Sequence, residues 1–371
     1  MPRVAILFEY PTLYGGERSM LAALNAMDRS QIEIVAIAPA EGLLAEAIAE
    51  IDIEHVPFQV FDENRKRRPR EQVLPALVEV VQQVAPDVLH ANSLSMSVMT
   101  GQLKLPIPRI GHLRDIVRLS KNVINTLNKN DLLLAVSEAT RNFHVGNGVD
   151  PLKTRVAYNG VDTNVFAPDL YPRKLRKELG VPDDTMLALT VGQIGLRKGL
   201  DVLVRAIKLV APKLEHLHFL IVGERSSSKA ETIEYERELH ESLAEAELTN
   251  RVHWLGYRTD IPQLMNEADL LVHAAKQEPL GRVLLESAAA GLPMVATEVG
   301  GTSEIVQDKL SARLVPPNDE NELAIGIWEL ASDPDLRSRF ALAARETAVE
   351  RFCVSEADQQ LLRAWKLFLL S

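Results

Sequence analysis

The chain has 371 residues, of which 46% are hydrophobic and 25% charged, and its formal net charge is −10. This length exceeds the usual size of a single hydrophobic core, so two domains are expected. The acidic balance argues against a nucleic-acid-binding protein, but a small anionic ligand stays open because local cations and backbone dipoles can outweigh a diffuse acidic surface.

The sequence also indicates the cellular compartment in which the protein is expected. The single cysteine, Cys353, excludes a disulfide within the chain and fits a reducing environment. No apolar run approaches the ~20 residues that a membrane-spanning helix needs. The opening residues MPRVAILFEY become acidic too soon for a secretory signal and predict a first strand. We therefore expect a soluble, cytoplasmic protein.

Short apolar runs alternate with amphipathic segments along the whole chain. The predicted strands are 3–9, 32–39, 53–58, 87–92, 107–112, 132–137, 153–158, 185–192, 217–223, 251–255, 270–275, 293–297 and 312–316. Helical patterns lie between most of them, for example at 71–85 and 201–214. This alternation predicts an α/β fold of parallel sheets covered by helices.

The stretch 159–184 contains proline but no strand pattern, so the domain junction is placed there. The expected domains are 1–168 and 169–353, each a doubly wound, Rossmann-like unit. The segment 354–371, with a helix near 355–369, is expected to pack back toward the N-terminal domain. Ligands of such sheets bind outside the carboxyl ends of the strands, so both sets of strand ends are expected to face one cleft.

The loop after the first strand contains Gly15 and Gly16, which allow the backbone to approach a ligand closely. Glu17 and Arg18 then open a helix whose N–H groups point toward that ligand. The alternative is a tight turn with a helix cap. The dinucleotide pattern G-x-G-x-x-G is absent here and after the strand that ends at Gly192, which counts against a nicotinamide or flavin enzyme.

A second loop carries two cations, Arg197 and Lys198, immediately before a helix that Gly199 opens. Cations at a helix N-terminus oppose its dipole. Two in a row are better explained by an anion that both they and the helix end bind. The alternative is an exposed pair that the fold tolerates.

The segment QEPLGRVLLESAAAGLPMVAT, residues 277–297, contains Glu278 and Glu286 in otherwise small and apolar surroundings. Its helix is predicted from Arg282 to Ala290. One interpretation of Glu286 is an i,i+4 ion pair with Arg282 on a solvated face, worth ~0.2–0.5 kcal/mol. The other is that both glutamates bind a ligand.

Together these segments resemble the retaining family-4 glycosyltransferases, which have the GT-B fold. The resemblance runs through VGQIGLRKG, IVGE (221–224), VHWLGYRTDIPQLMNEADLLVHAA (252–275), EPLGRVLLESAAAGLPMVAT and GGTSEIV (300–306), and upstream through YGGERS (14–19), AVSEATR (135–141) and YNGVD (158–162). It covers nearly the whole chain and is most specific from Trp254 to Val306.

The resemblance implies that a sugar moves from a nucleotide-diphosphate donor to a hydroxyl acceptor, a glycan or lipid-linked glycan, with retained anomeric configuration. This would serve polysaccharide or glycolipid synthesis. The implied catalytic residues are Glu278, Lys198 and His112. The implied donor-binding residues are Gly15, Gly16, Gln193, Arg197, Gly223, Tyr257, Leu280, Gly281, Arg282, Val283 and Glu286.

Within that set, the resemblance implies that Glu278 contacts sugar hydroxyls and Glu286 the ribose hydroxyls. Backbone N–H groups of 280–283 would hold the diphosphate, and Tyr257 and Arg258 lie where the family meets the base. Carboxylates accept bidentate hydrogen bonds from vicinal hydroxyls, and a diphosphate suits a helix N-terminus.

One position departs from the family, which usually has arginine where this chain has Gln193. A neutral amide cannot replace a cation on the leaving diphosphate, so Arg197 is expected to take over part of that work beside Lys198. No metal site and no cofactor are expected, because cations and dipoles meet the charge and the nucleotide sugar is a substrate.

His112 in RIGHLRDIV ends a predicted strand and matches a family histidine near the reacting sugar. The alternative is a structural histidine. Arg114 and Asp115 could form a local pair, and His90 and Asn92, at the end of another strand, are weaker candidates.

The run 65–70 places five cations in six positions: Arg65, Lys66, Arg67, Arg68 and Arg70. One interpretation is a solvated loop. The other is peripheral contact with the inner membrane face, at ~1 kcal/mol per residue near anionic lipid, or with a charged acceptor. A solvated loop is the usual structure of such a run in an acidic protein, and the resemblance supports the second interpretation only in that family members with lipid-linked acceptors use a basic patch on this domain.

Two rival functions keep the same fold. One is a GT-B epimerase. The other is a catalytically silent nucleotide-sugar-binding protein, which Gln193 favours and which intact Glu278, Glu286 and Lys198 oppose.

Overall fold

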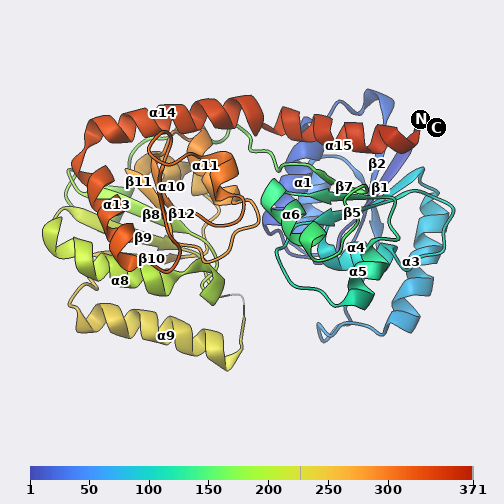
Figure 1. The fold of residues 1–371 in the computed structure, drawn as a ribbon, viewed down its shortest axis with the longest axis horizontal. Helices are drawn as coiled ribbons and strands as arrows, with labels where there is room; N and C mark the ends of the chain where they lie inside the picture. The colour runs from blue at the N-terminus through green and yellow to red at the C-terminus, as the bar shows by residue number, and fades with distance from the viewer. Residues whose placement is uncertain (226, 370–371) are drawn as a thin grey trace. The chain divides into compact units, whose positions relative to one another are not determined.

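A computed structural model describes residues 1–225 and 227–369 (Figure 1). The chain forms two compact units. The N-terminal unit comprises Met1–Gly160 and the final segment that starts at Val354, and the C-terminal unit comprises Val161–Cys353. The chain thus passes between the units after Gly160, within the stretch 159–184 and eight residues before the boundary expected at 168.

The N-terminal unit contains a seven-stranded parallel sheet of order β3-β2-β1-β4-β5-β6-β7. Its strands are β1 (Arg3–Leu7), β2 (Glu33–Ala38), β3 (Glu54–Pro57), β4 (Val88–Ala91), β5 (Arg109–Leu113), β6 (Leu132–Ala135) and β7 (Thr154–Val156). Its helices are α1 (Gly15–Ala26), α2 (Leu43–Glu50), α3 (Arg70–Val84), α4 (Leu94–Thr100), α5 (Lys121–Leu127), α6 (Glu138–Gly146) and α15 (Val354–Leu369), with a 3-10 turn at Arg29–Gln31.

The sheet of this unit is buried on both faces, as its continuous apolar strands require. Along β1 the side chains alternate: Val4 and Ile6 pack in the cluster formed with α1, α2 and α15, whereas Ala5 and Leu7 pack in the cluster formed with α3 and α4. Figure 1 shows α1 and α15 on one side of the sheet. The period of two along the strand therefore places helices on both faces.

The C-terminal unit contains a six-stranded parallel sheet of order β10-β9-β8-β11-β12-β13. Its strands are β8 (Met186–Val191), β9 (Leu217–Val222), β10 (Val252–Gly256), β11 (Leu270–His273), β12 (Met294–Thr297) and β13 (Arg313–Val315). Its helices are α7 (Leu175–Leu179), α8 (Leu200–Val210), α9 (Ala230–Glu245), α10 (Ile261–Glu267), α11 (Arg282–Ala289), α12 (Thr302–Ile305), α13 (Glu320–Ser332) and α14 (Pro334–Arg351), with 3-10 turns at Leu196–Lys198 and Ala211–Lys213.

Helix α8 shows why this unit folds. Leu203 and Ile207 are fully buried and pack in one cluster with Phe219 of β9 and Leu323 of α13. These positions recur at the helical spacing, so a single stripe of α8 faces the sheet. Every predicted strand of both units is confirmed, and with them the fold class of two doubly wound, Rossmann-like domains.

In both sheets the strand order reverses beside the first strand. β1 pairs with β2 on one side and β4 on the other, and β8 pairs with β9 and β11 in the same way. Loops that leave two such neighbouring strands diverge and leave a crevice at the carboxyl ends, where doubly wound folds bind ligands. The loops to inspect therefore follow β1 and β4 in one unit and β8 and β11 in the other.

Helix α15 joins the end of the chain to the N-terminal unit. It lies against α1 and β4, and its Trp365 is fully buried. The Oε1 atom of Gln360 accepts a hydrogen bond from the backbone N–H of Tyr158 at 2.9 Å. The last helix thus contributes core residues to the unit formed by the first 160 residues.

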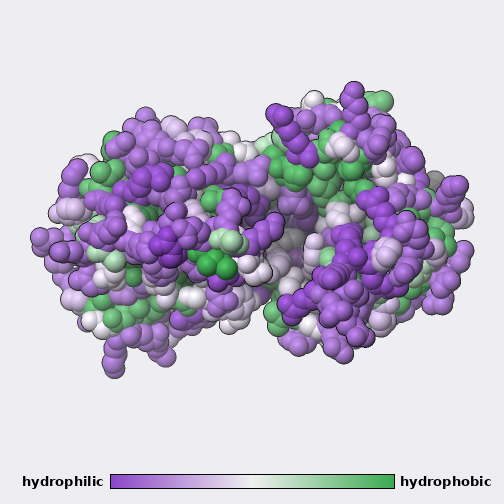
Figure 2. Space-filling model, turned by 90° about the horizontal axis from the view of Figure 1, so that it is seen from below, coloured by the Kyte–Doolittle hydropathy of each residue, from purple (hydrophilic) through white to green (hydrophobic). Residues whose placement is uncertain are grey.

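The surface carries no obvious membrane-crossing element. Across 1–225 and 227–369, no helix is long and apolar enough to span a bilayer. Hydrophilic residues cover most of the face shown in Figure 2, with smaller hydrophobic areas between them.

Candidate functional site

The loops that follow β8 and β11 bring a buried ion pair to the reversal point of the C-terminal sheet. Nζ of Lys198 lies 2.6 Å from Oε2 of Glu278, and Glu278 is only 8% exposed. Nε2 of His273, the last residue of β11, lies 3.3 Å from the same carboxylate oxygen. Two residues that are 80 positions apart in the sequence therefore form one charged centre.

Gly199 allows these two loops to meet. Its φ is +65°, and a Cβ atom there would lie 2.0 Å from the carbonyl oxygen of Ala274. Any other residue would push the loops apart, because backbone atoms cannot yield as a flexible side chain can. The backbone N–H of Lys276 also donates to the carbonyl of Arg197 at 2.8 Å. The close packing of these two loops therefore requires glycine at position 199, between Lys198 and the start of α8.

The charge state of Glu278 follows from its neighbours. Burial raises the pKa of this carboxyl, but the Lys198 ammonium and the His273 imidazole lower it more, so the net pKa lies below the usual range. Burial lowers the pKa of His273, although Glu278 opposes that change. At neutral pH the centre holds an ionised carboxylate, an ammonium ion and a neutral imidazole.

Helix α11 begins beside this centre. Gly281, with a φ of +106°, precedes its first residue Arg282, and the helix ends one residue before the predicted Ala290. Nε of Arg282 donates to Oε1 of Glu286 at 2.5 Å, so the i,i+4 contact is present. The face is not solvated, however, because Glu286 is 8% exposed. Nη1 of Arg282 is buried without a hydrogen-bond partner among the described residues.

The other predicted donor residues of this unit follow neighbouring strands. Arg197 is exposed and Gln193 half-buried in the loop after β8. Gly223, after β9, has a φ of +138°, and a Cβ atom there would lie 1.9 Å from the carbonyl oxygen of Gly192. Tyr257, after β10, is 51% exposed. Successive strands β8 to β11 therefore carry the predicted residues at their carboxyl ends.

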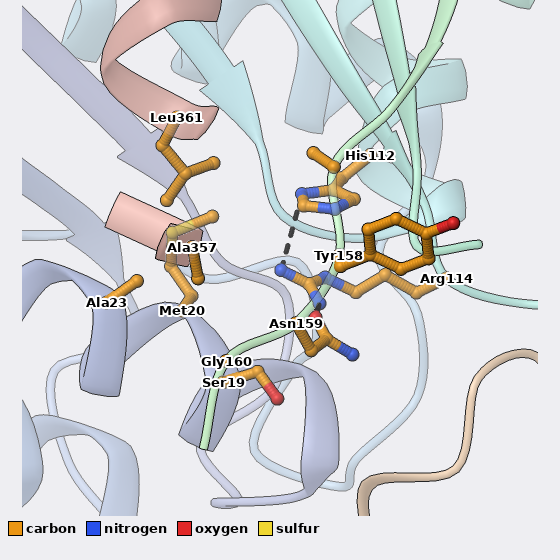
Figure 3. Close-up of a pocket in the computed structure, with 11 residues that line it drawn as sticks. Ser19, Met20, Ala23, His112, Arg114, Tyr158, Asn159, Gly160, Ala357 and Leu361 are labelled. Atoms are coloured by element: carbon orange, nitrogen blue, oxygen red, sulfur yellow. Dashed lines mark hydrogen bonds between the residues drawn. The ribbon is translucent and has the colours of Figure 1, made fainter. Parts of the chain in front are cut away.

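In the N-terminal unit, His112 lies at the end of β5 and is 2% exposed. Nη2 of Arg114 lies 3.3 Å from its Nδ1 atom, and Arg114 also donates to the side-chain oxygens of Asn92 at 2.8 Å and Asn159 at 2.7 Å. Figure 3 shows His112, Arg114 and Asn159 at a small cavity that Ser19 and Met20 also line, and its volume is about 10 Å³.

Burial shifts both ionisable groups of this cluster. It lowers the pKa of Arg114 to about 10. It also holds the pKa of His112 well below the usual value, and the neighbouring Arg114 and His90 lower it further. His112 is therefore neutral at physiological pH. Arg114 directs its donors to Asn92, Asn159 and His112, and no ion pair with Asp115 occurs among the described residues.

The glycine pair lies against the same arginine. Helix α1 begins at Gly15, and the carbonyl of Gly16 accepts a hydrogen bond from Nδ2 of Asn92 at 3.4 Å. A Cβ atom at Gly16 would lie 3.1 Å from Cδ of Arg114. The first and fourth strands thus contribute their following residues to one cluster, as the strand order predicts.

The basic run is not a uniform solvated loop. Arg67 forms an ion pair with buried Glu9, 2.6 Å apart, and donates to Oγ of Ser95 at 2.8 Å. Arg68 donates to the carbonyl of Gln59 at 3.1 Å. The loop is therefore tied to the ends of β1 and β4 through Arg67, and Arg65, Lys66 and Arg70 are further exposed cations of the loop.

A second cavity, of about 470 Å³, opens beside this loop. Glu9, Arg67, Arg70 and Asp115 give it charged groups, and its apolar lining consists of Leu74, Leu94, Val98, Met99, Leu119 and Val123. An occupant with both polar and apolar parts would suit this lining.

Three site residues were not predicted from the sequence: His273, Asn159 and Glu9. His273 ends an apolar strand just as His112 does, so the same signal could have identified it. Asn159 lies in the segment YNGVD, and Glu9 follows the first apolar run. Glu278 lies in the loop that directly follows His273, whereas Arg114 and Arg67 lie in other segments than Asn159 and Glu9, and only the fold brings those two pairs together.

No cluster of three metal-binding side chains occurs among the residues that the structure describes. A D-x-D tripeptide does occur at Asp333–Asp335, but the carboxylate of Asp333 accepts a hydrogen bond from the N–H of Leu336 at 2.9 Å. That aspartate is thus the N-cap of α14.

Two family models match the chain. The model described as Glycosyl transferases group 1 matches residues 173–347, and Glycosyltransferase Family 4 matches residues 14–165. A D-inositol 3-phosphate glycosyltransferase of Stackebrandtia nassauensis is 34% identical over 224 residues, 58% of this chain and 49% of that protein. An alpha-maltose-1-phosphate synthase of Mycolicibacterium smegmatis is 30% identical over 249 residues, 64% and 63% of the two chains.

The chain spans about half the length of most of the curated relatives it matches. Solved structures match over their full length. The crystal structure of HepE from Anabaena in complex with UDP-glucose has a TM-score of 0.86 and 25% identity, covering 99% of this chain and 100% of that one. A sucrose-phosphate synthase from Thermosynechococcus elongatus, with a TM-score of 0.81 and 20% identity, shares the fold.

Replacing Lys198 with Met should destabilise the protein at neutral pH by roughly 3–5 kcal/mol, because ionised Glu278 would be buried without its main partner. In the wild type the pKa of Glu278 is lowered on folding, so its stabilisation is present above about pH 4.3 and is lost only as the pH falls further. In the variant burial raises that pKa, so the loss should shrink toward acidic pH.

Urea denaturation at several pH values measures this effect. Combining K198M with Glu278→Gln should recover much of the stability, and Lys213→Met, at an exposed position, is the matched control. A K198M loss that does not change with pH would show that the ion pair is not its cause.

Proposed function

We propose that this chain, which belongs to the group 1 and family 4 glycosyltransferases, transfers a sugar from a nucleotide-diphosphate donor to a hydroxyl acceptor with retained anomeric configuration. The observation that carries the proposal is the buried centre of Lys198 and Glu278 next to the start of α11. It offers a carboxylate for hydroxyl groups and positive potential for a diphosphate at one point.

Lys198 can serve both partners of this centre. An ammonium group has three N–H donors, and the contact with Glu278 at 2.6 Å uses one of them. The other two are available for oxygens of the diphosphate as its charge develops on departure. Arg197, exposed in the same loop, would add the second cation that Gln193 does not supply.

The start of α11 suits the diphosphate itself. The first N–H groups of a helix have no partner within it, and the helix dipole favours an anion there. The backbone N–H groups of 280–283 are therefore the proposed contacts, and the unpartnered Nη1 of Arg282 supports a polar ligand at this end. Gly281 enters the helix in the left-handed region, where a Cβ atom would lie 2.7 Å from Cδ1 of Leu284.

Glu278 and Glu286 would hold the two sugars of the donor. Glu278 is proposed to accept from hydroxyls of the transferred sugar and Glu286 from those of the ribose. Arg282 donates to Oε1 of Glu286, which orients the carboxylate. Tyr257, exposed after β10, and Gly223, after β9, are proposed to border the nucleotide.

The first point to test is which nucleotide base the donor carries. The neighbouring HepE structures contain UDP, UDP with glucose, and UDP-glucose, at 25–26% identity to this chain, which supports a uridine nucleotide sugar as the first donor to test. A thermal-shift panel of UDP-, GDP- and ADP-sugars tests binding, since a ligand at ~100 times its dissociation constant adds ~2.7 kcal/mol. Donor turnover then separates a transferase from a silent nucleotide-sugar-binding protein.

The acceptor is proposed to bind in the N-terminal unit. The cavity of about 470 Å³ combines charged groups with an apolar lining, which fits a glycan that carries a lipid or another apolar group. The exposed cations of the neighbouring loop would then meet an anionic surface. We therefore propose that the chain acts at the inner membrane face, in polysaccharide or glycolipid synthesis.

Replacing Glu286 with Ala should weaken binding of the free nucleoside diphosphate at least tenfold, because the ribose contact serves donor and product alike. Glu278→Gln, which keeps the shape of the side chain, should leave free nucleotide binding nearly unchanged and impair donor turnover. Calorimetry with nucleoside diphosphate measures both, with Glu298→Ala, an exposed position, as the control. Wild-type nucleotide affinity in both variants would contradict the assignment.

Turnover should survive an excess of EDTA, because Lys198, Arg197 and the start of α11 are proposed to meet the charge of the leaving diphosphate. Donor consumption with and without the chelator measures this. Activity that chelation abolishes and magnesium or manganese restores would overturn that part of the proposal.

The basic loop should bind the chain to anionic liposomes at low salt, and binding should fall with ionic strength because exposed charges are screened over ~8 Å at physiological salt. The triple variant R65N/K66S/R70S should release the protein. Asn is chosen at 65 because the φ of Arg65 is +59°. Arg67 and Arg68 are kept, since they hold the loop in place.

The control is K104S/K121S/K129S, which removes the same charge from exposed positions of the same unit. Donor affinity should stay the same in both triple variants. A wild-type protein that never sediments with anionic liposomes would leave the loop as a solvated segment.

A further inference from the structure

Three buried rings form a continuous chain of contacts in the N-terminal unit. Nε1 of Trp365, on α15, donates to Nδ1 of His90, on β4, at 3.1 Å. Nε2 of His90 lies 3.3 Å from Nδ1 of His112, on β5. The three side chains are at most 2% exposed. We call Trp365, His90 and His112 the ring relay.

The first contact fixes the tautomer of His90. An indole nitrogen can only donate a hydrogen bond, so Nδ1 of His90 must accept. Burial, with a smaller effect of Arg114, lowers the pKa of His90 to about 3, so the ring is neutral. A neutral imidazole carries one proton, which must therefore lie on Nε2. His90 consequently donates to Nδ1 of His112.

A second contact, independent of the first, favours the same state of His112. A guanidinium group can only donate, and Nη2 of Arg114 lies 3.3 Å from Nδ1 of His112. Two donors thus converge on one lone pair, which explains why both contacts are long for this type of bond. The proton of neutral His112 is left on Nε2.

That proton has no acceptor within the chain. Nε2 of His112 is buried without a hydrogen-bond partner among residues 1–225 and 227–369. The ring borders the small cavity of Figure 3, whose lining also includes Ser19 and Asn159. A buried N–H group without a partner costs free energy, so its persistence points to a ligand oxygen that completes it.

We propose that Trp365 and His90 are positioning residues that, with Arg114, hold His112 as the Nε2–H tautomer, so that it donates a hydrogen bond to substrate oxygen and does not act as a base. That the oxygen belongs to the transferred sugar rests on the proposed function. The tautomer itself does not, because it follows from donors within the chain.

The tautomer can be measured without any substrate. Nitrogen-15 NMR of histidine-labelled wild-type protein at neutral pH distinguishes protonated from lone-pair ring nitrogens, and the missing signals of His112→Gln assign His112. A single Nε2–H form is expected. An Nδ1–H form, or an exchanging mixture of both, would overturn the proposal even if the protein proves to be an active transferase.

Trp365→Phe tests the far end of the ring relay. Without the indole donor, His90 can hold its proton on Nδ1 and accept from His112, so His112 should become a tautomer mixture. We expect about a tenfold fall in kcat/KM for the sugar donor, the size of one lost hydrogen bond, with unchanged affinity for free nucleoside diphosphate. Trp328→Phe, at a position that is 48% exposed, is the matched control.

A pair of substitutions at His90 covers the case in which W365F does not fold. Gln at 90 keeps an N–H donor at the position of Nε2, whereas Leu removes it. His90→Gln should preserve the His112 signals and donor turnover, and His90→Leu should lose both in part. If His112 keeps its wild-type tautomer in both variants, Arg114 alone holds the ring and the roles of Trp365 and His90 are overturned.

Discussion

The reversal of strand order beside β1 and β8 is the constraint on which both candidate sites depend. In each sheet the first three strands are added in one direction from the first strand, and the later strands are added on its other side. The loops after the two strands at this reversal point therefore lead in opposite directions. Lys198 follows β8 and Glu278 follows β11, and they meet only because those strands are neighbours. In the other unit, Gly16 follows β1 and Asn92 follows β4, and the same relation brings them into contact.

The centre formed by Lys198, Glu278 and His273 contributes little net free energy to the stability of the fold. A buried ion pair recovers little more than its own desolvation cost, and apolar residues of similar volume often do as well. Close approach of the loops also requires Gly199 in the left-handed region, which excludes ordinary side chains there. The proposed binding role explains why the chain keeps this arrangement, because the carboxylate and ammonium would be oriented before a donor arrives.

The strands and the start of α11 could be predicted because they depend on local patterns: short apolar runs, and Gly281 before an apolar helix. The loops that carry the candidate site could be predicted as well, because each comes directly after a predicted strand. The contacts of individual side chains did not. Arg67 meets Glu9 across 58 positions, and Trp365 meets His90 across 275, so no pattern in the sequence relates them. The Arg282–Glu286 pair was anticipated, but its burial depends on the packing of α11 within the C-terminal unit.

The two clusters have different chemistry, and together they bear on how the proposed leaving group departs. Glu278 is held ionised by Lys198, and His112 is held neutral with its lone pair already accepting from two donors. In its own unit, neither group is therefore arranged to act as a general acid or base. A diphosphate does not need one, since it leaves as a stable anion whose charge must be met. The cations and helix N–H groups of the C-terminal unit are proposed to supply that need, which is why an acidic chain with a net charge of −10 can still be proposed to bind a diphosphate.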